Sequence, residues 1–379
     1  MFKKISLLVI VITLIFALSL SASALKVSAD AAVLIEANSK EVIFGKNENK
    51  KRSMASTTKI MTALITLEEG RHNDVVVTTK DMVSVEGTSM GLIEGDSVTM
   101  KSLVYGMLPP SGNDAANVAA ISIAGTTASF AKRMNERAAQ IGMKNTNFVT
   151  PSGLDHKDHY STAYDMALLG AQAIKNPEFR SICSSRSTRL SYGNPPYLRT
   201  LTNHNSLLKR YKYAIGIKTG FTKKSGRCLV SAAEKDGVLL IAVTLRAPND
   251  WDDHIKMFDY GFSKYERVKL DSNLEQYSLK VVGGDVKKVP VKCAYHPEFT
   301  AKLDSDVKIK RTIEIKHFEY APIIEGDIVG VAKYYDGRTL VCEVPIIASL
   351  SVDMTGEEIK ENKDVKKDSF FEKFFGGKD

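Results

Sequence analysis

Apolar residues up to about position 265 fall into runs that predict strands at both ends of a domain and helices between them. Two short runs separated by a polar turn begin this stretch, as in a β-hairpin. Three further apolar runs end it, and the last two are joined by the tight-turn sequence Lys235-Asp236-Gly237. Early and late strands of this kind favour one antiparallel, five-stranded sheet. The predicted strands are 31–36, 41–44, 213–219, 228–233 and 238–245.

The middle of this domain is expected to be helical. Residues 60–67 form a helix-like run that stops at Gly70, and segments rich in Ala, Leu and Met occupy about 100 to 175. A last helix near 251–265 would close the domain on the sheet. We therefore predict an α/β (α+β) fold, in which helices and a helical insert pack against the antiparallel sheet.

The pattern changes at about residue 268. From there to about 350 the apolar runs are short, β-branched and separated by turn residues, which is typical of a small all-β sandwich. We find no catalytic constellation in this region, and we expect domains at 30–267 and 268–350 with a charged tail at 351–379. The β-branched runs include 278–282, 289–291, 307–309 and 312–315.

The first residues predict a secretory signal. Lys3-Lys4 precedes an apolar run from Ile5 to Leu20, and the small residues Ala22-Ser23-Ala24 follow. We expect this signal peptide to lie within residues 1–29 and to be removed. The alternative is an uncleaved anchor, but the apolar run of about 16 residues is short of the roughly 20 that span a bilayer.

The net positive charge of the chain and the phenylalanines of its tail predict that the protein lies at the boundary between membrane and cell wall. The formal net charge is +8, and loss of the two signal lysines lowers it to +6, which suits an anionic wall or membrane surface. On a helix, Phe370, Phe371, Phe374 and Phe375 would share one side, as in an interfacial membrane anchor. The alternative is a helix that docks these rings on its own protein. We expect an exported protein at the extracellular face of the cytoplasmic membrane and the cell wall.

Other partners and cofactors are not indicated. No basic stripe is interleaved with aromatic residues, so nucleic acid is not an expected partner. Cys183, Cys228, Cys293 and Cys342 are too widely spaced for a zinc ribbon, and the histidines form no His-Glu-x-x-His motif. We therefore predict no metal site and no cofactor. The cysteines are expected to be buried free thiols, with Cys293 and Cys342 the pair to test for a disulfide.

The motif Ser56-Thr57-Thr58-Lys59 at the start of the helix-like run is a candidate nucleophile with its own base. Residues three apart on a helix share a face, so the Lys59 amine can lie against the Ser56 hydroxyl. The spacing alone is not specific, because Ser and Lys stand three apart elsewhere too. The other pairs are Ser23/Lys26, Ser129/Lys132, Ser206/Lys209 and Ser305/Lys308.

Two downstream motifs single out Ser56 from these pairs. Ser111-Gly112-Asn113 lies on a loop between predicted helices, where a reactive group can be presented. Lys218-Thr219-Gly220 ends an apolar strand, and its glycine leaves room for a substrate backbone. The order Ser-x-x-Lys, Ser-x-Asn, Lys-Thr-Gly resembles that of the penicillin-interacting serine acyltransferases.

Further segments resemble a narrower family. Pro151-Ser152-Gly153-Leu154-Asp155, Tyr160–Ala167 and Asn203–Leu208 are similar to segments of the low-molecular-mass penicillin-binding D-alanyl-D-alanine carboxypeptidases. The resemblance covers residues 30–265, and the layout of the β-rich domain and tail is similar too. It implies a β-lactamase/transpeptidase-like fold and a serine-type carboxypeptidase. Such an enzyme trims peptidoglycan stem pentapeptides that end in D-Ala-D-Ala and is acylated by penicillins and other β-lactams.

The resemblance also implies roles for individual residues in the chemical step. Ser56 would attack the carbonyl between two D-alanines, with Lys59 as the base. Ser111 would relay the proton to the departing amine. Asn113 would orient Lys59 and the substrate amide. Lys218 would be the second cation that lowers the pKa of Lys59.

Other residues are expected to bind the substrate. Lys218 and Thr219 of the Lys-Thr-Gly motif would receive the terminal carboxylate, and Arg246 could add a bidentate contact. For Arg246 a solvated arginine at a strand end is the equal alternative. The oxyanion would sit between the amides of Ser56 and Phe221, and the substrate would lie along the strand that ends in Gly220.

Three alternatives stay open. A class A β-lactamase shares the three motifs but needs a glutamate-directed water, and residues 148–168 contain Asp155, Asp158 and Asp165 but no glutamate. A D,D-endopeptidase of the same fold would cut cross-links instead of stem termini. A non-catalytic penicillin-binding wall scaffold is disfavoured because all the motif residues are intact.

Overall fold

The computed structural model describes residues 25–355 of the chain. The chain divides into two compact units, one up to Ser263 and one from Lys264. Each unit has its own sheets and core, and each is described by itself. Residues 1–24 of the signal peptide predicted within 1–29, and the tail phenylalanines, lie outside the described residues.

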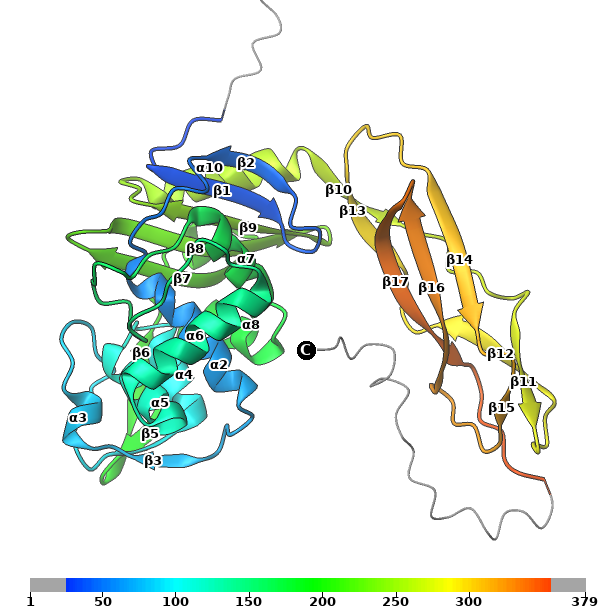
Figure 1. Ribbon diagram of the computed structural model, residues 1–379, viewed down its shortest axis with the longest axis horizontal. Coiled ribbons are helices and arrows are strands. Elements are labelled where there is room, and N and C mark those ends of the chain that lie inside the picture. The colour runs from blue at the N-terminus through cyan, green and yellow to red at the C-terminus, as the bar shows by residue number, and fades with distance from the viewer. Residues whose placement is uncertain (1–24, 356–379) are drawn as a thin grey trace, which may run out of the picture. The chain divides into compact units, whose positions relative to one another are not determined.

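The first unit is built on a five-stranded antiparallel sheet with the strand order β2-β1-β9-β8-β7 (Figure 1). Every strand predicted for this sheet is present, so the predicted architecture is confirmed. The tight turn at Lys235-Asp236-Gly237 joins β8 to β9, and Asp236 there has a φ of 50°. The strands are β1 (Ala31–Glu36), β2 (Val42–Lys46), β7 (Ala214–Thr222), β8 (Gly226–Lys235) and β9 (Val238–Leu245).

Both faces of this sheet are covered by helices (Figure 1). Leu34 and Leu240 point to one face, where they pack under Gly261 of α10 (Asp250–Phe262). Neighbouring residues of the strands point the other way, and Ile241 packs under Gly170 of α7 (Ala163–Ala173). Burying each such side chain contributes roughly 1.5–3 kcal/mol, so this alternation fixes the register of the sheet.

The helical insert between β2 and β7 carries the predicted helices. The helix predicted at 60–67 is α2, and it follows directly on the 3₁₀ helix η1. Among the described α-helices of the insert, all but the short helix at 207–210 share one hydrophobic core with α2. These elements are η1 (Ala55–Thr58), α2 (Lys59–Glu68), α3 (Lys80–Val83), α4 (Met100–Met107), α5 (Asn113–Ala124), α6 (Thr127–Ile141), α8 (Pro177–Ser184) and α9 (Leu207–Arg210).

Two strand pairs in the insert were not expected from the sequence. One is β3 (Val75–Val77) with β4 (Ser97–Thr99), and the other is a hairpin of β5 (Ser187–Gly193) and β6 (Pro196–Thr202). Most residues of the hairpin are exposed or half-buried, and polar residues occupy much of both strands. A strand without a clear apolar face gives no alternation signal, which explains why the sequence did not reveal it.

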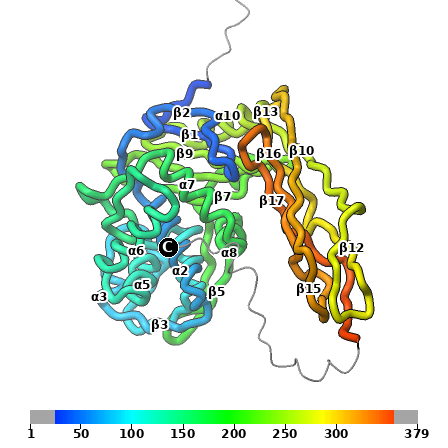
Figure 2. Tube along the Cα trace, turned by 45° about the vertical axis from the view of Figure 1, so that its right-hand side comes forward, coloured from blue at the N-terminus to red at the C-terminus, as the bar shows by residue number. Residues whose placement is uncertain are grey.

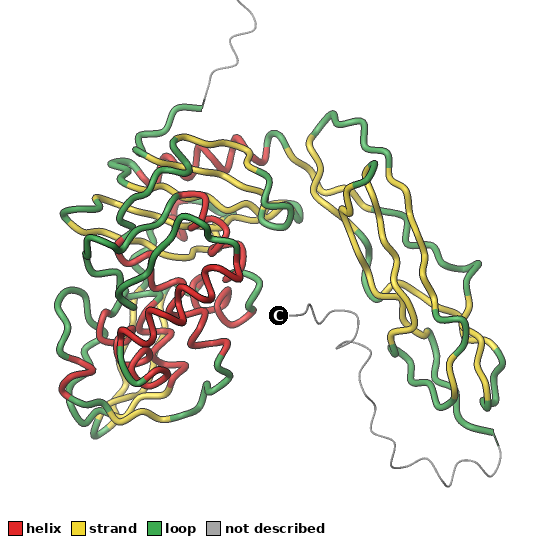
Figure 3. The backbone as a smooth tube through the Cα atoms, viewed as in Figure 1, coloured by secondary structure: helices red, strands yellow, loops and turns green. Residues whose placement is uncertain are grey.

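The second unit is β-rich, as predicted, and Figure 3 draws its described part as strands and loops. Its main sheet has the order β14-β16-β17-β12-β11-β15, and a two-stranded sheet pairs β10 with β13. In Figure 2, β16 and β17 run side by side as the longest antiparallel pair of this unit. The strands are β10 (Tyr265–Lys269), β11 (Ser278–Val282), β12 (Lys288–Cys293), β13 (Glu298–Lys302), β14 (Ile309–Ile315), β15 (Glu319–Tyr320), β16 (Ile328–Asp336) and β17 (Thr339–Ala348).

The cysteines are free thiols, as favoured from the sequence. Cys183 and Cys228 are buried, and burial raises the pKa of Cys183 to about 12 and that of Cys228 to about 11. Cys293 and Cys342, the pair singled out for a disulfide, are half-buried and unbonded. Within residues 25–355, no helix is both long and apolar enough to cross a membrane.

Candidate active site

Ser56 lies on η1, one turn before α2 begins, and faces the amine of Lys59. The two side chains are three residues apart, and Ser56 Oγ lies 2.8 Å from Lys59 Nζ. Lys59 itself has no exposed surface, whereas Ser56 is half-buried at the wall of a cavity. Ala55, with a φ of 47°, turns the chain into this short helix. The local sequence therefore presents a hydroxyl to solvent and hides its neighbouring base.

The other contacts of Lys59 Nζ show how the amine can act as a base. Nζ donates to Asn113 Oδ1 and to the backbone oxygen of Ser152, each at 2.6 Å. A neutral amine has two N–H groups and one lone pair. Because two acceptors take the two N–H groups, the lone pair is left to face the Ser56 hydroxyl.

Burial also shifts the proton equilibrium of this amine. The pKa of Lys59 is held well below its ordinary value, first by burial and then by the charge of Lys218, while Asp114 opposes the shift. Burial lowers the pKa of Lys218 to about 7. Because the charge of Lys218 adds to the effect of burial on Lys59, we infer that a protonated Lys218 favours the neutral, basic form of Lys59 beside the nucleophile.

Ser111 and Asn113 stand at the start of α5 on a turn that the neighbouring loop holds in place. Ser111 has a φ of 68°, in the left-handed region that a serine seldom occupies, and its side chain lines the cavity. Asn113 donates from its backbone N to Thr88 O at 2.7 Å and from Nδ2 to Glu86 O at 2.6 Å. These two bonds fix the amide so that its oxygen points at Lys59.

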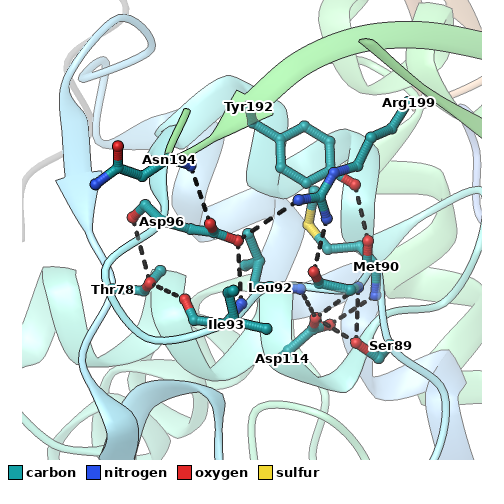
Figure 4. A network of polar contacts seen from close by, with 11 residues as sticks. Thr78, Ser89, Met90, Leu92, Ile93, Asp96, Asp114, Tyr192, Asn194 and Arg199 are labelled. Carbon is teal, nitrogen blue, oxygen red and sulfur yellow. Dashed lines mark hydrogen bonds and ion pairs between the residues drawn. The ribbon is translucent and has the colours of Figure 1, made fainter. Parts of the chain in front are cut away.

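Asp114 is the centre of a network that holds the loop opposite α5 (Figure 4). Its carboxylate accepts hydrogen bonds from Ser89 Oγ and from the backbone N atoms of Met90, Gly91 and Leu92, at 2.5–3.1 Å. Asp114 is almost fully buried, so each of these charge-assisted bonds is made in a low dielectric. The loop is thereby bound to the helix that carries Asn113.

The β5–β6 hairpin secures the same loop from its outer side (Figure 4). Tyr192 Oη donates to Met90 O at 2.8 Å, and Arg199 Nη1 donates to Gly91 O at 2.6 Å. The Arg199 guanidinium also lies 3.7 Å from Asp96 Oδ2 and 4.3 Å from the Tyr192 ring centroid. The unexpected hairpin therefore supports the loop at residues 89–92, although no described residue of the hairpin lines the catalytic cavity.

Strand β7 brings the Lys-Thr-Gly motif to the nucleophile. A break in the β7–β8 register, with positive φ at Gly216 and Ile217, precedes Lys218, which is 1% exposed. Lys218 Nζ donates to Thr219 O at 2.9 Å. A Cβ atom on Gly220 would lie 3.0 Å from Met54 O and 3.1 Å from Ser56 N, so glycine lets β7 pass close to the nucleophile without displacing these atoms.

The three motifs meet at one cavity of about 280 Å³. Ser56, Ser111, Thr219, Gly220 and Phe221 all line it, as expected, and Phe221 is 66% exposed. Lys59 and Asn113 lie behind this lining, where they contact each other.

Lys218, which is 1% exposed, is not part of the cavity lining, and Arg246 is the expected site residue that the structure places at a different cavity. It lies past the end of β9 and lines a second cavity, described below. The guanidinium at the catalytic cavity belongs to Arg227, which donates from Nε and Nη2 to Asp250 Oδ1 at 3.0 and 2.6 Å. The same guanidinium carbon lies 5.3 Å from the Trp251 ring centroid, and Asp250 and Trp251 also line the cavity.

Gly153 is a second site residue that the sequence reasoning did not single out. Its φ is 85°, and an added Cβ would lie 2.1 Å from Ala55 O. Glycine therefore lets the chain pass close to η1, where the carbonyl of Ser152 reaches Lys59. The segment Pro151-Ser152-Gly153 was noticed only for its family resemblance, and its backbone contact with Lys59 has no signature in side-chain type.

Within residues 25–355 no group of His, Cys, Asp and Glu side chains has the geometry to hold a metal ion. His159 is buried instead as a structural residue, with Nε2 2.8 Å from Thr58 Oγ1 and Nδ1 accepting from Val149 N at 2.9 Å. Burial lowers the pKa of His159 to about 4, so its imidazole is neutral near pH 7.

Two family descriptions match consecutive parts of the chain. Residues 19–249 match the family described as D-alanyl-D-alanine carboxypeptidase. Residues 262–354 match the family described as penicillin-binding protein 5, C-terminal domain.

Individual relatives agree with these matches. The D-alanyl-D-alanine carboxypeptidase DacF of Bacillus subtilis is 33% identical over 340 residues, which cover 86% of this chain and 87% of that protein. Among solved structures, the D-alanyl-D-alanine carboxypeptidase DacD of Francisella tularensis has a TM-score of 0.63 at 27% identity, over 88% of this chain and 95% of its own. The Streptomyces K15 DD-transpeptidase has a TM-score of 0.60 at 30% identity, over 63% and 98%.

Proposed function

Because this chain belongs to the D-alanyl-D-alanine carboxypeptidase family of low-molecular-mass penicillin-binding proteins, we propose that it removes the terminal D-alanine of peptidoglycan stem pentapeptides through an acyl-enzyme on Ser56. It is a serine-type hydrolase, and penicillins acylate the same nucleophile. The observation that carries the assignment to Ser56 is the 2.8 Å approach of its Oγ to the buried amine of Lys59.

The acylation step follows from this geometry. Ser56 Oγ attacks the carbonyl carbon between the two D-alanines while its proton passes to Lys59 Nζ. The carbonyl oxygen becomes an oxyanion, which the amides of Ser56 and Phe221 stabilise. As the C–N bond breaks, the proton on Lys59 is delivered through Ser111 to the nitrogen of the departing D-alanine.

Hydrolysis of the acyl-enzyme uses the same groups in reverse order. Lys59 takes a proton from a water molecule that attacks the ester carbon, and the proton then returns to Ser56 Oγ as the ester bond breaks. The neighbouring acids already have other partners: Asp155 accepts from Thr222 Oγ1 at 3.1 Å, and Asp165 accepts from Asn145 N at 2.7 Å. This disfavours a β-lactamase that relies on an acid-directed water.

The substrate binds as an extended strand on β7. This strand is at the edge of the sheet and is paired only with β8, so its other side can accept backbone hydrogen bonds from a peptide. We place the terminal carboxylate at Thr219, which lines the cavity, next to the buried ammonium of Lys218, which donates to the backbone oxygen of Thr219. The cavity offers Arg227 as a further cation for this carboxylate, and Arg246 is not assigned to it because it lines the other cavity.

We also propose that the protein is exported and works at the outer face of the cytoplasmic membrane. The proposal is supported by the basic and apolar sequence of residues 1–24 and by a peptidoglycan substrate, which lies outside that membrane. An amphipathic anchor in the tail, with Phe370, Phe371, Phe374 and Phe375, would hold it there. Both segments lie outside the described residues.

The assignment is tested with purified full-length protein. Incubation with penicillin should add the mass of the drug to a peptide that contains Ser56, and incubation with a pentapeptide should release D-alanine. Ser56→Ala should abolish both, whereas Ser129→Ala, at an exposed Ser/Lys pair on α6, should abolish neither. The reverse pattern would overturn the assignment.

The same assay separates the remaining alternatives. Release of D-alanine from uncross-linked muropeptides identifies a carboxypeptidase, and cleavage of cross-linked dimers identifies an endopeptidase. A penicillin adduct without either hydrolytic product would identify a non-catalytic scaffold.

A further inference from the structure

A second cavity, of about 380 Å³, is lined by basic side chains. Five cationic residues contribute to it: Lys51, Arg52, Lys157, Lys224 and Arg246. They come from four separate segments, which are the approach to η1, the 151–160 loop, the β7–β8 turn and the end of β9. Among the described residues that line this basic cavity, none is acidic.

Most of this positive charge is not neutralised by neighbouring side chains. Arg52 forms an ion pair with Asp30, and its buried Nε has no hydrogen-bond partner in the described structure. Lys51 Nζ lies 4.5 Å from the ring centroid of Tyr160. For Lys157, Lys224 and Arg246 no ion pair with a described residue is found, and all three side chains are exposed. The cavity therefore concentrates cations that a soluble anion can reach.

The basic cavity is separate from the catalytic cavity. The two share no lining residue within residues 25–355. One buried side chain links the two regions. His159 lines the basic cavity, and its Nε2 contacts the hydroxyl of Thr58 in the turn that carries Ser56. Ser53, also at the basic cavity, is three residues before the nucleophile. An anion in the basic cavity would thus bind beside the catalytic turn without occupying the substrate site.

We propose that the basic cavity binds phosphate groups, either those of a soluble phosphate chain or those of lipid headgroups. Each phosphate offers several strong acceptor oxygens, and a chain of them carries multiple charges, which matches several ammonium and guanidinium donors around one hollow. A single carboxylate carries one charge and two oxygens, and it would leave most of these donors unpaired. Ser53 and Tyr160 add hydroxyl groups to the lining.

The test is a titration of the full-length protein with inorganic tripolyphosphate, followed by calorimetry at low and at physiological salt. We expect binding that weakens with salt. Replacing three of the cations, Lys51→Gln, Lys157→Gln and Lys224→Gln together, should weaken binding about tenfold or more at low salt, because each charge at contact distance contributes about fivefold in water. Release of D-alanine from a short soluble pentapeptide should be unchanged in this variant.

A matched control removes the same number of charges elsewhere on the unit. Lys132→Gln, Lys144→Gln and Lys209→Gln together change exposed lysines away from both cavities. This control should bind tripolyphosphate like the wild type. Equal weakening in both triple variants, or no binding by the wild type, would overturn the proposal. Citrate bound as tightly as tripolyphosphate would overturn the assignment to phosphate.

Vesicles distinguish the two sources of phosphate. They contain either phosphatidylcholine alone or phosphatidylcholine with phosphatidylglycerol. Retention on the anionic vesicles that is lost in the Lys51, Lys157 and Lys224 variant indicates lipid headgroups. Binding of tripolyphosphate without such vesicle retention indicates a soluble phosphate chain. Vesicle retention that survives the triple substitution, together with no binding of tripolyphosphate, would contradict the proposal.

Discussion

The catalytic cavity and the basic cavity both depend on lysine, but they place it in opposite surroundings. At the catalytic site, Lys59 and Lys218 are buried outside the cavity lining, and burial lowers the pKa of both. In the basic cavity, Lys157 and Lys224 are exposed to water, which solvates an ammonium group. The comparison teaches that the surroundings decide the function: a buried lysine becomes a base, and an exposed lysine serves as a charge.

The largest effect is expected where the buried base is removed. Lys59→Met keeps the volume of the side chain but leaves Ser56 without a proton acceptor, so acylation by penicillin should fall about 10³- to 10⁴-fold. The matched change in the basic cavity, Lys157→Met, should leave the acylation rate within about twofold, since this side chain is exposed. Stopped-flow measurement of acylation checks both. A similar loss of acylation rate in both variants would contradict the claim that only the buried lysine acts as a base.

The next effect concerns the backbone that holds Lys59. Gly153→Ala adds a Cβ at 2.1 Å from Ala55 O, so η1 or the Ser152 carbonyl must move, and acylation should slow about 10- to 100-fold. Gly142→Ala is the control, because Gly142 has a similar φ of 92° but nothing within 4 Å of an added Cβ. Both variants should lose about 1 kcal/mol of stability from the positive φ. A normal acylation rate in Gly153→Ala would show that the Ser152 contact is dispensable.

The pH dependence tests the assignment of protons to the two buried lysines. The free enzyme needs a neutral Lys59 and a protonated Lys218, so kcat/KM should fall in acid as Lys59 gains a proton. It should also fall as the pH rises above about 7, where Lys218 loses its proton. Lys218→Arg keeps the charge and should move the alkaline limb to higher pH, at reduced overall activity. If the alkaline limb of the kcat/KM profile does not move in Lys218→Arg, the limb reports the titration of a group other than Lys218.

The smallest expected effect is on KM, and it distinguishes Arg227 from Arg246. Arg227→Gln removes a cation from the catalytic cavity and should raise KM for a pentapeptide about 5- to 30-fold, as expected for one charged hydrogen bond. Arg246→Gln removes a cation from the basic cavity and should change KM less than twofold while it weakens tripolyphosphate binding. Steady-state kinetics on the two variants decides between them. A raised KM in Arg246→Gln would restore the contact first expected from the sequence.

The sequence predicted the sheet, the helical insert and the trio of motifs because each has a local signature. Apolar runs mark β7, β8 and β9, and the spacing of Ser56 and Lys59 matches one helical turn. The meeting of the motifs at one cavity followed from family resemblance, since residues 56, 111 and 218 are distant along the chain.

The parts that were missed depend on contacts without such a signature. The β5–β6 hairpin is mostly polar, and its role comes from Tyr192 and Arg199, which bind backbone oxygens of a distant loop. Arg227 near the start of β8 lines the catalytic cavity, and Arg246 past the end of β9 lines the basic cavity. Residue type does not distinguish them, because each arginine lies at an end of an apolar run.

The position of β7 at the edge of its sheet affects the tendency of the protein to aggregate. A nine-residue strand that is paired on one side only is a template for any extended chain, including a second copy of this protein. Lys223 and Lys224, just past the end of the strand, repel a like-charged copy. The open edge that admits the substrate is therefore also the edge at which copies can aggregate, and a ligand that pairs with β7 blocks both events.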